Sequence, residues 1–309
     1  MSDEIPLGPG AEFDAIRQML ARWGDRAVGI GNDAAVLRLP RGDALVASVD
    51  ATVEGQHFRR EWLSPREVGY RAITAALSDL AAAAAKPVGV LIALELPRSW
   101  RAELDDIADG IGDAVDAANA RILGGNVSDA ETLSITTTVL GSAFIALTRR
   151  GAHAGDRVYV TGTLGGPAAV LERLLRGEAP GVHRPRFARP RARLTESQWL
   201  AERGATAAID VSDGLLADLR HLAAASAARI ELDARRVPRL PEVTPEQALS
   251  SGEEYELIVT APSAFDTEEF ERSFGIPLTE IGSVAGGSAG VDVRGARVAD
   301  VTGWNHLSR

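Results

Sequence analysis

The sequence has no cysteine, which excludes disulfides, thiolate nucleophiles and cysteine-ligated zinc. It also lacks a long hydrophobic run. Its most apolar stretch, residues 81–96, is interrupted by Lys86, Pro87 and Glu95, so no membrane span is expected. The first residues, MSDEIPLGPG, have neither the basic region nor the apolar core of a signal peptide. We therefore expect a cytoplasmic protein that does not contact a membrane.

The chain has no excess of positive charge. Its formal net charge is -10 and its sequence pI is about 5.1. Proteins that bind nucleic acids or anionic membrane surfaces by charge need a basic face, so neither partner is expected. Phosphate ligands stay possible if metal ions or local arginines neutralise them. The length of 309 residues, with 45% hydrophobic and 25% charged residues, predicts two globular domains.

Hydrophobic periodicity and turn residues predict alternating helices and strands. Ser64 and Pro65 are typical of the cap and first position of a helix. A segment rich in proline and arginine, residues 177–193, is predicted to be a loop. Both halves mix helices with strands, so the fold class is α/β or α+β, with a boundary between domains 1–149 and 150–309. The predicted helices are 12–23, 64–85, 99–118, 167–175 and one from Leu215, and the predicted strands are 44–53, 88–97, 131–145, 157–161 and 252–262.

Several aspartates interrupt or end these apolar elements. Asp79 lies inside a helix rich in alanine and leucine, where a buried unpaired carboxylate would cost several kcal/mol. It therefore needs a cation, an arginine partner or a capping role. Together the aspartates favour a hard cation such as Mg²⁺, which prefers carboxylates, water and phosphate oxygens. The aspartates concerned are Asp33, Asp50, Asp79, Asp210 and Asp213.

Each motif also has a purely structural interpretation. Asp33 and Asp50 are compatible with a turn or a strand end. Ser212 and Asp213 are compatible with capping of the helix that begins at Leu215. The glycine-rich turn 162–166 can approach a phosphate, although a tight turn is the simpler interpretation. Taken together, the acids favour metal-assisted phosphate chemistry.

The motifs occur in an order that resembles the thiamine-monophosphate kinase family. They are GNDAAVL, SVDATVEGQHF, LSDLAAAAAKP, GGNVS, TRRGAHAGDRVYVTGTLG, AIDVSDGLLADL and SGEEYEL. The resemblance implies ATP-dependent phosphorylation of thiamine monophosphate to thiamine diphosphate by in-line transfer with magnesium ions. It also implies an N-terminal α+β domain that forms a barrel with its copy in a homodimer, beside a C-terminal α/β domain.

The resemblance assigns roles to individual residues, and it requires no covalent nucleophile, because the substrate phosphate attacks directly. Gly125 and Asn126 are expected in a loop after a strand. His57 and Glu253 are also compatible with structural roles, and Trp304 with simple packing. The implied metal ligands are Asp33, Ser48, Asp50, Asp79, Asn126, Asp210 and Asp213; the ATP-binding residues are Gly125, Asn126, Arg149 and Ser212; and the substrate-binding residues are His57, Glu253 and Trp304.

The chain departs from the family pattern at several of these motifs. Asn126 stands where the family has a metal-binding aspartate and donates oxygen without charge. The changed positions are Asn32, Val49, Ala76 and Asn126, together with residues 251–254, which read SGEE where the family has GGED. Three readings stay open: an enzyme with weaker magnesium sites, an enzyme with a different small phosphate substrate, or a paralogue that binds nucleotide or thiamine phosphate without turnover.

Overall fold

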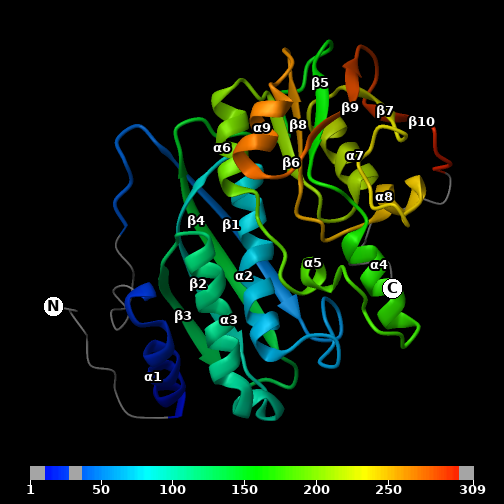
Figure 1. Ribbon diagram of the computed structural model, residues 1–309. Coiled ribbons are helices and arrows are strands. Elements are labelled where there is room, and N and C mark those ends of the chain that lie inside the picture. The colour runs from blue at the N-terminus through cyan, green and yellow to red at the C-terminus, as the bar shows by residue number, and fades with distance from the viewer. Residues whose placement is uncertain (1–10, 28–36, 299–309) are drawn as a thin grey trace. The chain divides into compact units, whose positions relative to one another are not determined.

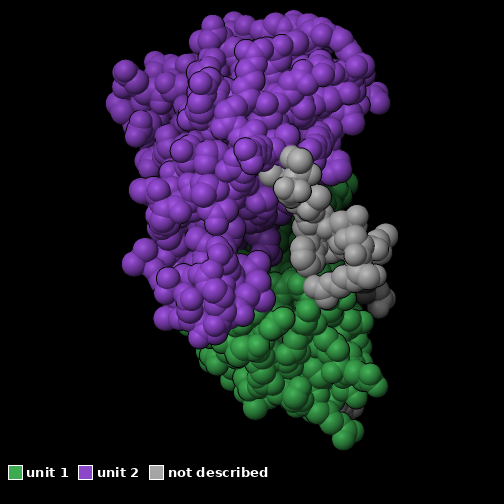
Figure 2. Space-filling model, turned by 90° about the vertical axis from the view of Figure 1, so that its right-hand side faces the viewer, with its two compact units in different colours: residues 1–80, 86–144 green, residues 81–85, 145–309 purple. Residues whose placement is uncertain are grey.

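A computed structural model describes residues 11–27 and 37–298 of the chain (Figure 1). The chain divides into two compact units, Met1–Leu80 with Lys86–Phe144 and Ala81–Ala85 with Ile145–Arg309 (Figure 2). Each unit contains its own mixed sheet and helices, so the predicted two-domain α/β class is confirmed. Within the described ranges, no helix combines the length and apolar character needed to cross a bilayer.

The first unit is built on a sheet with the strand order β1-β4-β2-β3. The β2–β3 pair is parallel, and the other neighbouring strands are antiparallel. Helices α2 and α3 lie along one face of this sheet (Figure 1). Its elements are α1 (Ala11–Trp23), η1 (Gly24–Arg26), β1 (Ala44–Val53), α2 (Pro65–Ala82), β2 (Lys86–Glu95), η2 (Arg98–Glu103), α3 (Leu104–Ala117), β3 (Ile122–Ser128) and β4 (Ser134–Ala143).

Strand β1 divides its side chains between the two faces of the sheet, as strand geometry requires. Ser48 and Asp50 lie on the face toward α2, because the Ser48 hydroxyl donates a hydrogen bond to Asp79 of that helix. Leu45 and Val49 belong to the opposite set, and they are 58% and 62% exposed. Strand β1, one of the two edge strands of this sheet, therefore exposes large apolar side chains on the face opposite Ser48 and Asp50.

The second unit is built on a sheet with the order β10-β7-β9-β5-β8-β6. Its core consists of alternate strand residues and the inner faces of the helices, with Val158, Ile209, Ile230 and Ile258 almost fully buried. Its elements are β5 (Arg157–Thr161), α4 (Gly166–Leu175), α5 (Arg184–Ala188), α6 (Leu194–Glu202), β6 (Ala207–Asp210), α7 (Leu215–Ala225), β7 (Arg229–Asp233), α8 (Pro245–Ser250), β8 (Leu257–Ala261), α9 (Thr267–Phe274), β9 (Leu278–Ala285) and β10 (Gly290–Arg294).

The structure corrects several predicted elements. The helix expected over 99–118 begins with the six-residue 3-10 helix η2, and the loop expected over 177–193 contains helix α5. The strand expected over 252–262 begins only at Leu257. The reason for the last error is local: Glu253 and Tyr255 have φ angles of 56° and 53°, which a strand cannot contain.

Candidate functional site

Three of the predicted metal ligands come together in the first unit. The alternation of β1 places Ser48 and Asp50 on one face. Asp79 reaches the same place from α2 and accepts a hydrogen bond of 2.5 Å from the Ser48 hydroxyl. One Asp50 oxygen, Oδ1, accepts from the backbone N–H of Ala51. Two carboxylates and a hydroxyl are hard oxygen donors, so this group fits Mg²⁺ chemically.

Gly125 and Asn126 lie in strand β3, so the prediction that they follow a strand in a loop is wrong. Gly125 is required there, because a Cβ atom would lie 1.9 Å from the backbone oxygen of Ile92. Strand β3 forms the edge of the sheet opposite β1, with β4 and β2 between them. Three strand spacings separate the edges by about 14 Å. Within one sheet, Asn126 is therefore not brought to Ser48 and Asp50.

His57 lies in the turn after β1. Its ring Nδ1 accepts a hydrogen bond of 3.0 Å from the backbone N–H of Val53. The backbone N–H of His57 in turn donates to the backbone oxygen of Val53. A neutral His57 must then carry its proton on Nε2. The ring is thus oriented by the end of β1, close in the chain to Asp50.

In the second unit, three of the predicted site residues lie together at the end of β6 and in the segment that follows it. Asp210 ends β6 in a buried position, and Ser212 and Asp213 follow at half-buried positions before α7. The proposal that Ser212 or Asp213 caps α7 is wrong: the cap position is Gly214, and no side chain caps it there.

Asp218 organises this segment, and sequence reasoning missed it. Its Oδ2 accepts from the backbone N–H groups of Ser212, Asp213 and Gly214 at 3.1–3.2 Å. Burial, with the nearby charges of Asp210 and Asp213, raises the pKa of Asp218 to about 8. The signal in the sequence was an acid in the first turn of an apolar helix, at a position that faces the core.

Glu253 is brought to the same segment. Its backbone N–H donates to the Ser212 oxygen at 2.8 Å, and the N–H of Tyr255 donates to the Val211 oxygen at 2.9 Å. The backbone N–H of Val211 also donates to the backbone oxygen of Glu256 at 2.8 Å. Backbone hydrogen bonds therefore join the turn that carries Glu253, a predicted substrate residue, to the loop that carries Ser212, a predicted nucleotide residue.

Arg149 lies elsewhere in this unit. Its carbonyl oxygen accepts from the hydroxyl of Ser226, the residue at the C-terminal cap of α7. Ser212 precedes the N-terminus of the same helix, whose 11 residues span about 16 Å. The backbone of Arg149 and that of Ser212 are thus at opposite ends of α7.

Behind Glu253, two buried glutamates form an ion-pair network. Glu254 accepts from the Gly165 N–H, the Ser251 hydroxyl and Arg186 Nη2. Burial is the main cause that raises the pKa of Glu254 to about 7, while Arg186 opposes it. The Glu254 side chain therefore joins the 251–256 turn to the glycine-rich turn.

Glu256 completes the network. It accepts a fork of two hydrogen bonds from Arg193 and one of 2.7 Å from the Thr161 hydroxyl. Gly162 has a φ of 66°, and a Cβ atom there would meet the Glu256 carboxylate at 2.2 Å. The glycine-rich turn is therefore shaped by a buried carboxylate, which supports the tight-turn interpretation.

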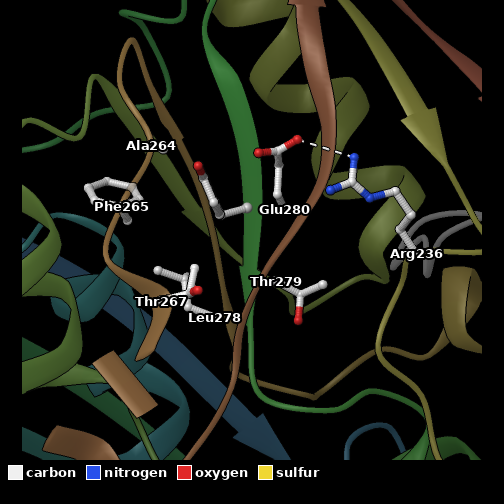
Figure 3. Close-up of a pocket in the computed structure, with 8 residues that line it drawn as sticks. Arg236, Ala264, Phe265, Thr267, Leu278, Thr279 and Glu280 are labelled. Atoms are coloured by element: carbon white, nitrogen blue, oxygen red, sulfur yellow. Dashed lines mark hydrogen bonds and ion pairs between the residues drawn. The ribbon is translucent and has the colours of Figure 1, made fainter. Parts of the chain in front are cut away.

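A surface pocket of about 550 Å³ lies apart from these residues in the second unit (Figure 3). Strand β9 contributes Thr279 and Glu280, and the Arg236 side chain reaches Glu280 from the opposite side (Figure 3). Arg157 also pairs with Glu280. None of the predicted site residues that the structure describes lines this pocket, and its two charged side chains, Arg236 and Glu280, form an ion pair with each other.

Two predicted residues, Asp33 and Trp304, lie outside the described residues. In the part of the chain that the structure does describe, no three His, Asp or Glu side chains are gathered as a ready-made metal cluster. The oxygen donors instead occur in two groups, Ser48 with Asp50 and Asp79 in one unit and Asp210 with Asp213 in the other.

Comparison with known proteins identifies the class first. Residues 31–143 match the N-terminal domain of AIR synthase related proteins, and residues 153–294 match their C-terminal domain. The chain is also 36% identical over 294 residues to thiamine-monophosphate kinase of Escherichia coli strain K12, covering 86% of this chain and 89% of that protein.

Solved structures agree with this result. The crystal structure of thiamine-monophosphate kinase from Stenotrophomonas maltophilia K279a has a TM-score of 0.81 and 34% identity, covering 92% of this chain and 96% of that one. The structure of AaThiL complexed with AMPPCP and TMP has a TM-score of 0.78 and 32% identity, covering 99% and 100%. The chain belongs to the thiamine-monophosphate kinase family.

Proposed function

We propose that this protein is an enzyme that transfers the γ-phosphoryl group of ATP to thiamine monophosphate, forming thiamine diphosphate. The observation that carries the proposal is the family membership over most of the chain together with the assembly of Asp210, Ser212, Asp213 and Glu253 at one end of β6. The alternatives of a different substrate or of binding without turnover have no support in the comparisons.

The residues of the two domains would have separate roles. Ser48, Asp50 and Asp79 would hold Mg²⁺ in the N-terminal domain, and Asp210 and Asp213 would do so in the C-terminal domain. Bound magnesium would neutralise phosphate charge, the main requirement of phosphoryl transfer. Ser212 would bind nucleotide, with its N–H fixed by Asp218. Glu253 and His57 would orient the substrate, since alignment supplies much of the rate acceleration.

The remaining assignments belong to the same proposal. Domain 1–149 would bind ATP and metal and form the dimer, and domain 150–309 would be the C-terminal α/β domain. Arg149 and Gly125 would contact ATP, Asp33 and Asn126 metal, and Trp304 the substrate. We expect the enzyme to work in the cytoplasm.

A homodimer is part of the proposal because the β1 edge presents an apolar surface. Leu45 and Val49 are exposed on the face opposite the metal-binding side chains. A second copy placed against this surface would bury them, and two copies related by a twofold axis use the same patch twice. A second copy would also provide another β3 edge, and with it another Asn126.

The test is a product assay. Purified protein is incubated with ATP, thiamine monophosphate and a series of magnesium concentrations, and thiamine diphosphate is quantified. Formation of thiamine diphosphate that depends on both ATP and magnesium is the expected result. ATP binding without product at every magnesium concentration would refute the kinase assignment.

A further inference from the structure

Arg186 occupies a junction of three segments in the second unit. It comes from α5, and its Nη2 donates to the Thr163 oxygen of the glycine-rich turn and to Glu254 of the 251–256 turn. Its aliphatic end lies over Gly166, where a Cβ atom would be 3.1 Å from Arg186 Cδ. The same Nη2 is 3.8 Å from Glu256. One cation therefore serves two buried carboxylates.

The turn that these carboxylates anchor is strained. Glu253 and Tyr255 adopt left-handed φ angles, which are unfavourable for residues with a side chain because Cβ approaches the following carbonyl oxygen. Glu254 and Glu256 alternate with them and point into the ion-pair network. The strained conformation persists because the surrounding contacts fix it, and such strain often occurs at functional sites.

The backbone of this turn also bonds to the loop with the predicted nucleotide and metal residues. The N–H of Glu253 donates to the Ser212 oxygen, and that of Tyr255 donates to the Val211 oxygen. A shift of the turn would therefore move Glu253 relative to Ser212. Displacements of about 1 Å can reduce activity about 100-fold when groups must align.

We propose that Arg186 is a positioning residue: through its hydrogen bonds to Glu254 and to the Thr163 oxygen, with its charge also near Glu256, it holds the 251–256 turn, and with it Glu253, in register with Ser212. The role of Glu253 toward thiamine monophosphate rests on the proposed function. The positioning itself is a property of the fold. Arg193 supports the same network at Glu256 through its fork, but it makes no contact with Glu254 that could replace Arg186.

The test compares R186M, R186K and the double variant R186M/E254Q with the wild-type protein. R186M keeps the aliphatic stem and removes the cation, and R186K keeps the charge but loses the planar guanidinium whose Nη2 reaches both Thr163 and Glu254. R186M/E254Q removes one of the carboxylates that the cation serves. D156N is the matched control: Asp156 is a buried acceptor for Thr206 and His153 in the same unit, outside the 251–256 turn.

The first readout is hydrogen–deuterium exchange of the peptide over residues 251–257, measured on the whole protein without ligands. In R186M these amides should exchange at least about tenfold faster, because local opening is easier there, whereas D156N should leave them protected. R186M/E254Q should recover much of the protection. Uniform loss of protection across the unit, or no change at 251–257, would overturn the proposal.

The second readout is steady-state kinetics. R186M should raise the KM for thiamine monophosphate about tenfold or more, and raise the KM for ATP much less, with R186K intermediate. Equal changes in both constants would overturn the positioning of Glu253. If the wild-type protein forms no thiamine diphosphate, the proposed function fails, and the positioning role stands or falls on the exchange pattern alone.

Discussion

The buried carboxyl of Glu254 should make the stability of this protein fall as pH rises from about 4.5 to about 7. Burial raises its pKa from an ordinary 4.5 to about 7, although Arg186, the Ser251 hydroxyl and the Gly165 N–H all favour the charged form. Between these values the unfolded chain has released the proton and the folded protein keeps it. The folded state binds more protons, so its stability decreases with rising pH across this window.

The size of the effect follows from the two pKa values. The two pKa values differ by about 2.5, and each whole pKa step corresponds to about 1.36 kcal/mol. The difference therefore amounts to about 3 kcal/mol of unfolding free energy. E254Q removes the titrating group and keeps an oxygen that can accept from Gly165 and Ser251. The unfolding free energy of E254Q minus that of the wild type should therefore increase by about 3 kcal/mol from pH 4.5 to pH 8.

The assay is urea denaturation of both proteins at half-unit pH intervals, followed by circular dichroism, with E178Q as a control. Glu178 is an exposed carboxylate paired with Arg176 on the surface, and its pKa is lowered by that pair. An ion pair on the surface contributes little to the free energy of unfolding. The unfolding free energy of E178Q should therefore change with pH as that of the wild type does. A difference between E254Q and wild type that stays constant over the whole range would refute the argument.

Three further predictions concern the proposed activity. D79N should reduce turnover at least about 100-fold while the protein stays folded, because the amide oxygen can still accept from Ser48; wild-type turnover would remove Asp79 from the site. N126D should lower the magnesium concentration that gives half-maximal activity, since Mg²⁺ prefers charged oxygens; an unchanged magnesium titration would mean that residue 126 does not approach the metal. V49E places a charge on a side chain that is 62% exposed, so light scattering should find a folded monomer where the wild type is a dimer; a V49E dimer as stable as the wild type would exclude this face from the interface.

Local pattern was sufficient for much of the fold. The segment predicted as a strand, 44–53, has the same ends as β1, Ala44 and Val53, and the Ser64–Pro65 cap predicted the start of α2. Here Glu67 accepts from the Ser64 N–H and hydroxyl, so the cap depends on residues three apart in the chain. These features could be read because the groups that determine them are neighbours in the sequence.

The sequence also determined which residue types form the candidate site, but not how they are held. Asp218 was missed because an acid in the first turn of a helix is common on the surface, and only packing shows that its oxygen serves the N–H groups of Ser212, Asp213 and Gly214. The family resemblance placed Asn126 in a loop after a strand, whereas strand pairing places it within β3, at the sheet edge opposite β1.

The substitution at Glu254 shows the difference most clearly. In the sequence it looked like a weakened motif, one carboxylate lengthened by a methylene group. In the folded protein that carboxylate meets Arg186, which lies 68 residues earlier in the chain, and the N–H of Gly165, which lies 89 residues earlier. Burial then makes these partners obligatory, because a carboxylate removed from water without them would cost several kcal/mol. Residue types and local spacing belong to the sequence, whereas the pairing of distant charges is decided only when the tertiary structure removes them from water.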